Sequence, residues 1–355
     1  MSQLNYRLIS YIIGLLLLFN STAIFLTSFV SYYFSDGFFS SILKSGFICF
    51  ALGFSIMFFS KNPKKIINRR DGYLVVVIGW LTMVFSGMLP YIFTNTIDNV
   101  PDLIFETMSG YTTTGSSIIS DIEALPESII FWRSMTHWLG GMGIIVLAIA
   151  ILPMLGIGGM QLFSAEAPGS GISGDKIHPR ISNTAKRLWF IYFGLTLLET
   201  ILLNIAGMSF FDAINHSMSN IATGGFSTKN DSLSFWNSMP QIQYIIIFFM
   251  ILAGTNFLLI YLSLIGKFKK LFYNTEFIWF LGLIASFVLI TTVILNSNVN
   301  LDSTNFNHPQ IFGKLEASFR HALFQVVAII TTTGFVTGDF AAWTPFLTML
   351  FFGLM

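Results

Sequence analysis

Residues 111–116 read Tyr-Thr-Thr-Thr-Gly-Ser, residues 222–228 read Ala-Thr-Gly-Gly-Phe-Ser-Thr, and residues 331–337 read Thr-Thr-Thr-Gly-Phe-Val-Thr. Each stretch follows a half-apolar segment that is too short to cross a bilayer and precedes an apolar segment that is long enough. A Thr-rich strand that ends in Gly and returns every ~110 residues suits a ring of backbone carbonyls around a dehydrated cation. These stretches therefore predict a membrane protein through which cations permeate.

The composition is that of a chain solvated mostly by lipid. Of 355 residues, 54% are hydrophobic and 10% are charged, whereas a soluble domain carries about 25% charged residues. The single cysteine, Cys49, excludes an intrachain disulfide and a thiolate metal cluster. The first apolar run, residues 8–34, is too long for the core of a signal peptide, so we expect it to remain as an anchor.

Apolar windows long enough to span a bilayer divide the rest of the chain. The predicted spans are residues 8–34, 41–60, 73–95, 128–154, 187–208, 240–265 and 275–296, and an eighth begins near Thr344. The shorter segments 102–112, 212–222 and 314–330 precede the Thr/Gly strands, and we interpret them as re-entrant half-helices.

The placement of charge predicts the orientation. With a cytoplasmic N-terminus, most of the 18 Lys and Arg residues fall on the inner side and most acidic residues fall outside. All three Thr/Gly strands then lie on the outer side of a multi-pass membrane protein.

Aligning Gly115, Gly225 and Gly334 shows that the half-helices repeat one polar pattern. The residues thirteen and nine positions before each glycine are all polar, and those seven positions before it are apolar; the polar residues are Asp102, Asp212, His321, Glu106, His216 and Gln325. Positions four apart share a helix face. Each repeat therefore consists of a span, a half-helix, a Thr/Gly strand and a second span.

Such a repeat favours cations for physical reasons. A half-helix that descends from outside points its C-terminal carbonyls, the negative end of its dipole, at the membrane centre. Glycine tolerates the backbone angles that a row of inward carbonyls requires. Threonine is β-branched and suits an extended segment, and its hydroxyl supplies a further oxygen.

Several stretches outside the repeat resemble a known family. They are Phe131–Gly143, Ile151–Gln161, Ala165–Pro168 and Lys176–Lys186. Together with the Thr/Gly strands, they make the whole chain similar to the TrkH-type subunit of bacterial potassium uptake systems, in the Trk/Ktr/HKT superfamily.

The resemblance implies an all-α, pseudo-fourfold pore that takes up K+. It carries the K+ filter onto Thr113, Thr114, Gly115, Thr223, Gly224, Gly225, Thr332, Thr333 and Gly334. Since relatives with serine at the first filter glycine prefer Na+, the glycines here favour K+. The resemblance also implies a homodimer and a cytosolic, nucleotide-binding regulatory subunit of the TrkA type. We expect no nucleic-acid partner, and no cofactor besides the transported ion.

The repeat and the resemblance together divide the chain into four segments. Residues 1–70 hold two additional N-terminal spans and a basic cytoplasmic loop, residues 71–186 the first pore unit with its loop, residues 187–270 the second unit, and residues 271–355 an incomplete third unit. Family members carry a fourth unit and a gate loop in the third unit's second span. We expect this chain to stop before both and not to conduct selectively alone.

Other functions remain open on the sequence. A secondary cation symporter would use broken helices, usually in inverted repeats, whereas these repeats share one orientation. Gly171-Ile-Ser-Gly174 echoes the serine motif of intramembrane proteases, but Ser173 lies in a polar loop that we expect to contact the regulatory subunit. The overlapping Gly169–Gly174 pattern lacks the preceding strand of a dinucleotide site. We therefore predict that the chain is not an enzyme.

Three polar features within the predicted helices need an explanation. Glu199 and Asn204 lie in an apolar span, where they serve either function or interhelical packing. Arg133 and His137 share one helix face, and we expect a structural pair between Arg133 and an acid such as Glu106.

Overall fold

The computed structural model describes residues 4–61, 69–150, 181–298 and 309–355. Within these ranges the chain forms helices, turns and irregular segments and contains no β-strand. It divides into two compact units, with the boundary between Ala185 and Lys186, and each unit is described by itself. The loop that was predicted to contact a regulatory subunit, with Ser173 and the glycines around it, lies outside the described residues.

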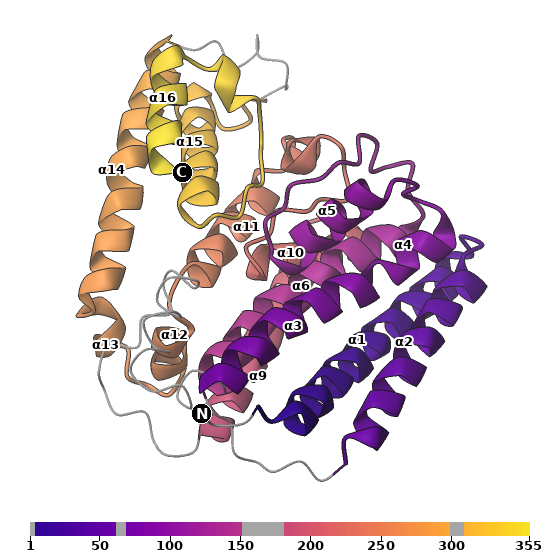
Figure 1. Ribbon diagram of the computed structural model, residues 1–355. Coiled ribbons are helices and arrows are strands. Elements are labelled where there is room, and N and C mark those ends of the chain that lie inside the picture. The colour runs from indigo at the N-terminus through magenta and orange to yellow at the C-terminus, as the bar shows by residue number, and fades with distance from the viewer. Residues whose placement is uncertain (1–3, 62–68, 151–180, 299–308) are drawn as a thin grey trace. The chain divides into compact units, whose positions relative to one another are not determined.

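The first unit contains an N-terminal hairpin and one half-helix between two spans (Figure 1). Its helices are α1 (Tyr6–Phe34), α2 (Phe39–Phe59), α3 (Arg69–Gly87), α4 (Leu89–Thr94), α5 (Val100–Tyr111) and α6 (Glu127–Ala150). The helix α1 packs against α2, α3 and α6. Gly14 and Gly53 allow the close α1–α2 approach, because a Cβ on Gly14 would lie 2.9 Å from the Gly53 carbonyl oxygen.

The second unit repeats the arrangement of half-helices and spans twice. Its helices are α9 (Ile181–Ile205), whose first residues precede the boundary, α10 (Phe210–Ile221), η1 (Ser232–Trp236), α11 (Pro240–Ala253), α12 (Phe257–Leu264), α13 (Lys269–Phe272), α14 (Thr275–Asn298), α15 (Lys314–Ile330), η3 (Phe340–Ala342) and α16 (Pro345–Leu354). A hydrophobic core joins α11, α14 and α15 through residues such as Ile246, Met250, Val288 and Val326. This core fixes the half-helix α15 against its two neighbours.

The apolar helices agree with the predicted spans. Among the described residues, five helices are long and apolar enough to cross a membrane: Tyr6–Phe34, Phe39–Phe59, Arg70–Thr94, Arg187–Ile205 and Thr275–Ser297. The described helix α6 covers the predicted span 128–154 as far as Ala150. The chain is thus a multi-pass membrane protein, with half-helices α5, α10 and α15 where the sequence predicts them.

One predicted span is not continuous. The segment 240–265 is broken into α11 and α12, which meet at an angle of 102°. The break has local causes: the Asn256 side chain accepts a hydrogen bond from the backbone N–H of Leu258 and so starts a new helix, after α11 has ended at Gly254. A Cβ on Gly254 would lie 2.8 Å from Cγ2 of Thr331. The break therefore lies against the start of the third Thr/Gly strand.

Candidate functional site

The three half-helices end in the same backbone turn. In each, the residue after the cap adopts the left-handed conformation, with φ of 54° at Thr113, 54° at Thr223 and 59° at Thr332. The backbone N–H of the following residue reaches back to the helix: Thr114 donates to the Ser109 carbonyl at 3.0 Å, Gly224 to Ser219 at 2.8 Å and Thr333 to Ala328 at 2.9 Å. This hydrogen bond closes the last helical turn and directs the chain away from the helix axis.

Threonine is an unusual residue for this turn. A β-branched side chain in the left-handed region is a steric outlier, and a residue held there costs on the order of 1–3 kcal/mol. The expectation that the threonines lie in an extended strand is therefore wrong for Thr113, Thr223 and Thr332. The left-handed turn outweighs the β propensity of threonine, because this one residue both closes the half-helix and begins the strand.

The strand glycines are also left-handed. The φ angles are 77° at Gly115, 81° at Gly225 and 75° at Gly334. Each strand thus has two left-handed residues two positions apart, first a threonine and then a glycine. The glycine adopts this backbone conformation without strain. The requirement for glycine that the sequence suggested is confirmed at these three positions.

The strand carbonyls are left available as ligands. Within the described residues, no hydrogen bond ends on the carbonyl oxygens of residues 112–115, 222–225 or 331–334. Unbonded carbonyl oxygens are costly in a membrane unless water or a cation occupies them. Each strand therefore offers a row of oxygen ligands suited to a cation.

The threonine hydroxyls differ between the strands. Oγ1 of Thr112 lies 2.8 Å from Oγ1 of Thr114, and Oγ1 of Thr331 lies 2.8 Å from Oγ1 of Thr333. The second strand has Ala222 and Gly224 at these positions and lacks the pair. The hydroxyl pairs thus brace the first and third strands internally.

The second and third strands touch. A Cβ on Gly225 would lie 2.1 Å from the carbonyl oxygen of Thr333, far inside van der Waals contact. Two separate features therefore require glycine rather than a larger residue at Gly225: its positive φ and the close approach of the third strand. Two of the predicted filter strands lie side by side, as a shared ion path requires.

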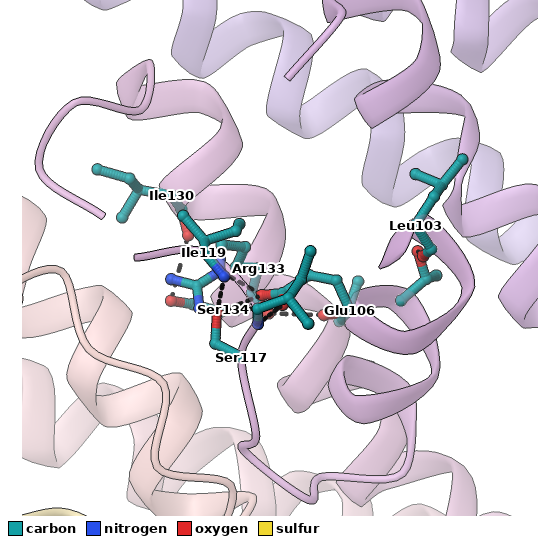
Figure 2. A network of polar contacts seen from close by, with 10 residues as sticks. Leu103, Glu106, Ser117, Ile119, Ile130, Arg133 and Ser134 are labelled. Carbon is teal, nitrogen blue, oxygen red and sulfur yellow. Dashed lines mark hydrogen bonds and ion pairs between the residues drawn. The ribbon is translucent and has the colours of Figure 1, made fainter. Parts of the chain in front are cut away.

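Polar residues of the half-helices fasten the ascending chain that follows each strand. In the first unit, the ascending chain bonds to Glu106, nine positions before the strand glycine. Its carboxylate accepts hydrogen bonds from the Ser117 hydroxyl at 3.1 Å and from the backbone N–H of Ile118 at 3.0 Å. Arg133 of α6 donates to the same carboxylate at 2.9 Å, and both side chains are buried. Figure 2 shows Glu106, Ser117 and Arg133 joined in this network, which confirms the predicted pair.

The second half-helix uses both of its polar positions. Nε2 of His216 lies 3.0 Å from the Ser227 hydroxyl, and the Thr228 hydroxyl donates to the Asp212 carboxylate at 2.5 Å. Ser227 stands two residues after the strand glycine, as Ser117 does in the first unit. Two half-helices therefore hold the outgoing chain through equivalent pairs.

The third half-helix uses the earlier polar position. Nδ1 of His321 lies 2.9 Å from the Thr337 hydroxyl, three residues after the strand glycine. The Thr337 carbonyl accepts a hydrogen bond at 2.9 Å from Asn237, in the loop after the second strand. Gln325, at the later position, has a buried side-chain oxygen to which no residue in the described ranges donates a hydrogen bond.

Asn204 and Glu199, the polar residues of the apolar span, also have hydrogen-bond partners. Asn204 donates to the Met208 carbonyl at 3.1 Å and closes the turn before α10. Glu199 is fully buried and accepts a hydrogen bond from Asn220 at 2.6 Å. Sequence reasoning missed Asn220, because an asparagine near a helix end is an ordinary feature. Its place five residues before the strand glycine was the available signal.

The chain is similar to known proteins both in sequence and in fold. The model of the TrkH family, described as a cation transport protein, matches residues 39–355. The Trk system potassium uptake protein TrkH of Salmonella typhimurium is 39% identical over 349 residues, covering 98% of this chain and 70% of that protein. The corresponding Escherichia coli protein is 38% identical with the same coverage. The crystal structure of the potassium transporter TrkH from Vibrio parahaemolyticus superposes with a TM-score of 0.85 at 35% identity, covering 99% of this chain and 70% of that chain.

Proposed function

The chain belongs to the TrkH family of cation transport proteins, and we propose that it takes up K+ through a carbonyl-lined filter. Potassium uptake by a Trk system is the function of its similar relatives by name, and the resemblance extends over nearly the whole chain. Transport of an ion, rather than catalysis, is therefore its activity.

The observation that carries the filter proposal is the backbone turn that the three strands share. Each places left-handed residues at the same two positions and leaves its carbonyl oxygens unbonded. A K+ ion that enters a filter exchanges its hydration shell for such oxygens. In this proposal the ion contacts Thr113, Thr114 and Gly115 of the first strand, Thr223, Gly224 and Gly225 of the second, and Thr332, Thr333 and Gly334 of the third.

The contacts behind the strands support selectivity for K+. Discrimination between K+ and Na+ requires that the oxygens keep their number and spacing. The pairs of Glu106 with Ser117, His216 with Ser227, and His321 with Thr337 tie each strand to its half-helix at a point just past the glycine. Each strand is thus fixed at both ends.

Gly225 provides the direct test of the filter. Replacement by alanine adds a Cβ at a φ of 81° and 2.1 Å from the Thr333 oxygen, so the second and third strands must separate. In the full-length protein, which the later uptake measurements also use, we expect Gly225→Ala to abolish selective K+ uptake in a strain that lacks its own K+ transporters. The matched control is Gly282→Ala in α14, where a Cβ meets nothing within 4 Å. Normal K+ over Na+ selectivity in Gly225→Ala, at normal protein amounts, would reject the filter assignment.

We also propose an orientation with the N-terminus in the cytoplasm of a bacterial cell and the strands on the outer side. The distribution of Lys and Arg supports it. In a Cys49→Ala background, a membrane-impermeant thiol reagent should label Ala124→Cys, after the first strand, in intact cells. It should not label Lys61→Cys, at the end of α2. The opposite pattern would reverse the orientation.

The proposed partners are a second copy of the chain and a cytosolic, nucleotide-binding subunit of the TrkA type. The support is membership in a family of Trk system membrane subunits. Co-purification of two differently tagged copies tests the dimer. Nucleotide-sensitive co-purification with the regulatory subunit tests the second partner.

A further inference from the structure

Glu199 is a buried acid that the proposed ion path does not use. It lies on α9, within the apolar span Arg187–Ile205, and its side chain is fully buried. No ion pair to Glu199 occurs among the described residues, and its sole hydrogen-bond partner there is Asn220. An acid in such a place needs a physical explanation.

Asn220 connects this acid to the second filter strand. Its amide nitrogen donates to Oε1 of Glu199 at 2.6 Å and to the Ile246 carbonyl of α11 at 3.2 Å. Its backbone carbonyl accepts a hydrogen bond at 2.8 Å from the N–H of Thr223, the left-handed residue of the strand. One residue therefore joins α9 and α11 to the turn that starts the filter strand.

Two atoms of this pair lack the partner that they need. Both Oε2 of Glu199 and Oδ1 of Asn220 are buried, and neither forms a hydrogen bond with any residue that the structure describes. Turning the amide over would set Oδ1 against the Ile246 carbonyl, acceptor against acceptor, so the amide orientation is fixed. An ionised carboxylate would leave Oε2 of Glu199 and Oδ1 of Asn220 unsatisfied and its charge without a counter-ion.

A proton on Oε2 of Glu199 satisfies both of these oxygen atoms. A protonated carboxyl group has an O–H donor, and Asn220 Oδ1 is the acceptor that lacks a donor. The acid and the amide can then exchange two hydrogen bonds, O–H to Oδ1 and N–H to Oε1, with each group fully used. His216, the titratable residue of α10 nearest to Asn220 in sequence, is already engaged through both ring nitrogens, with the Asp212 carbonyl and Ser227.

We propose that Glu199 is a protonated positioning residue, which holds Asn220 and through it the second filter strand in register. The pair is particular to this repeat, because Gly110 and Ile329 stand at the positions equivalent to Asn220. Glu199 acts through Asn220 and does not touch the ion. The inference rests on the proposed filter, but its spectroscopic test does not require transport.

Glu199→Gln separates this role from that of a charge. Glutamine reproduces the neutral acid, because its oxygen accepts from Asn220 and its amide N–H donates to Oδ1. We expect Glu199→Gln to keep K+ uptake and K+ over Na+ selectivity within about twofold of the parent, whereas Glu199→Leu should lower selectivity by roughly tenfold through loss of a buried hydrogen-bonded pair. Ile201→Leu, at an exposed site of the same helix, controls for changes in α9.

Infrared spectra of the purified protein provide the second measurement. The parent should show the carbonyl band of a buried carboxylic acid, and Glu199→Gln should lack it. Absence of that band in the parent, or a loss of selectivity in Glu199→Gln equal to that in Glu199→Leu, would overturn the proposal. Unchanged selectivity in Glu199→Leu would also overturn it. Failure of the filter itself would be seen separately, as normal selectivity in Gly225→Ala.

Discussion

The hydroxyl of Tyr111 donates a hydrogen bond of 2.7 Å to Oδ1 of Asn20, which precedes it by 91 residues. Tyr111 is the last residue of α5, directly before the first Thr/Gly strand, and Asn20 lies in the middle of α1. Asn20 in turn donates to the Ser86 hydroxyl of α3 at 2.7 Å. The N-terminal hairpin lies outside the repeats, but through Asn20 it holds the residue at which the first Thr/Gly strand begins.

Tyr111→Phe should loosen this anchor without changing the size of the ring. The Asn20 oxygen would lose its donor in a fully buried place, which costs about 1–2 kcal/mol. We expect a lower unfolding temperature in detergent and weaker discrimination between K+ and Na+. Tyr32→Phe, at an exposed tyrosine of α1, should change neither. A double-mutant cycle with Asn20→Ala should show coupling, and additive effects would contradict the anchor.

Asp36 makes the same hairpin sensitive to acid. This carboxylate, in the α1–α2 loop, accepts a hydrogen bond of 3.1 Å from the backbone N–H of Ser128 and thereby caps α6. Partial burial alone would raise the pKa of Asp36, but hydrogen bonds from Ser128, Ser31 and the backbone of Phe38 outweigh it and hold the pKa below its ordinary value. The stabilisation is therefore present above the ordinary aspartate range and is lost as pH falls through the lowered pKa.

Asp36→Asn should remove that dependence. At pH 7 we expect the free energy of unfolding to fall by about 1 kcal/mol, the usual effect of a weakened helix cap. The difference from the parent should shrink as the pH falls below about 4, where Asp36 becomes protonated first in the unfolded chain. Thermal unfolding measured across this pH range provides the check, with Asp98→Asn as an exposed control. A difference that stays constant down to about pH 2 would exclude the linkage.

The elements that hydropathy controls could be predicted from the sequence. The half-helices α5, α10 and α15 and most spans follow from segment length and apolar content. The break after Ala253 could not be predicted, because Gly254, Thr255 and Asn256 interrupt the apolar run too briefly to lower its average. The Asn256 cap that starts α12 is local, whereas the contact of Gly254 with Thr331, which is distant in sequence, cannot be read from the sequence.

The candidate site was predictable in position but not in backbone geometry. The alignment identified the strand glycines and the polar helix positions, because both are properties of residue type and spacing. The left-handed angle at Thr223 contradicts local propensity and results from closure of the helix turn. The partners of the polar positions, such as Ser117 for Glu106, depend on where the chain returns after the strand. Periodicity contains no information on that path.

The ion pair between Glu106 and Arg133 should be essential as a pair rather than as single charges. Glu106→Gln leaves the buried Arg133 guanidinium without its carboxylate, and removal of one partner of a buried pair costs about 3–5 kcal/mol. We expect poor yield and a much lower unfolding temperature. Glu106→Leu combined with Arg133→Met should recover part of the loss, because neither charge remains. Asp98→Asn, at an exposed position before α5, should behave like the parent. Equal losses in the single and double variants would contradict this account.

Thr332 should reveal the strain in the filter turn. Its φ of 59° is unfavourable for a β-branched residue, so Thr332→Gly removes strain while it adds backbone freedom to the unfolded chain. These effects oppose each other, and we expect the free energy of unfolding to stay within about 0.5 kcal/mol of the parent or to rise. Thr348→Gly in the helix α16 has no strain to relieve and should lower it, because glycine is a poor helix former.

Selectivity in Thr332→Gly should change in the opposite direction to stability. A glycine at the start of the third strand permits other backbone angles, so the carbonyls of Thr333 and Gly334 no longer keep one spacing. We expect K+ uptake to persist with weaker exclusion of Na+, measured as competition between the two ions in cells that lack other K+ transporters. A variant that is both less stable and fully selective would show that Thr332 is unstrained and that the turn does not set the filter geometry.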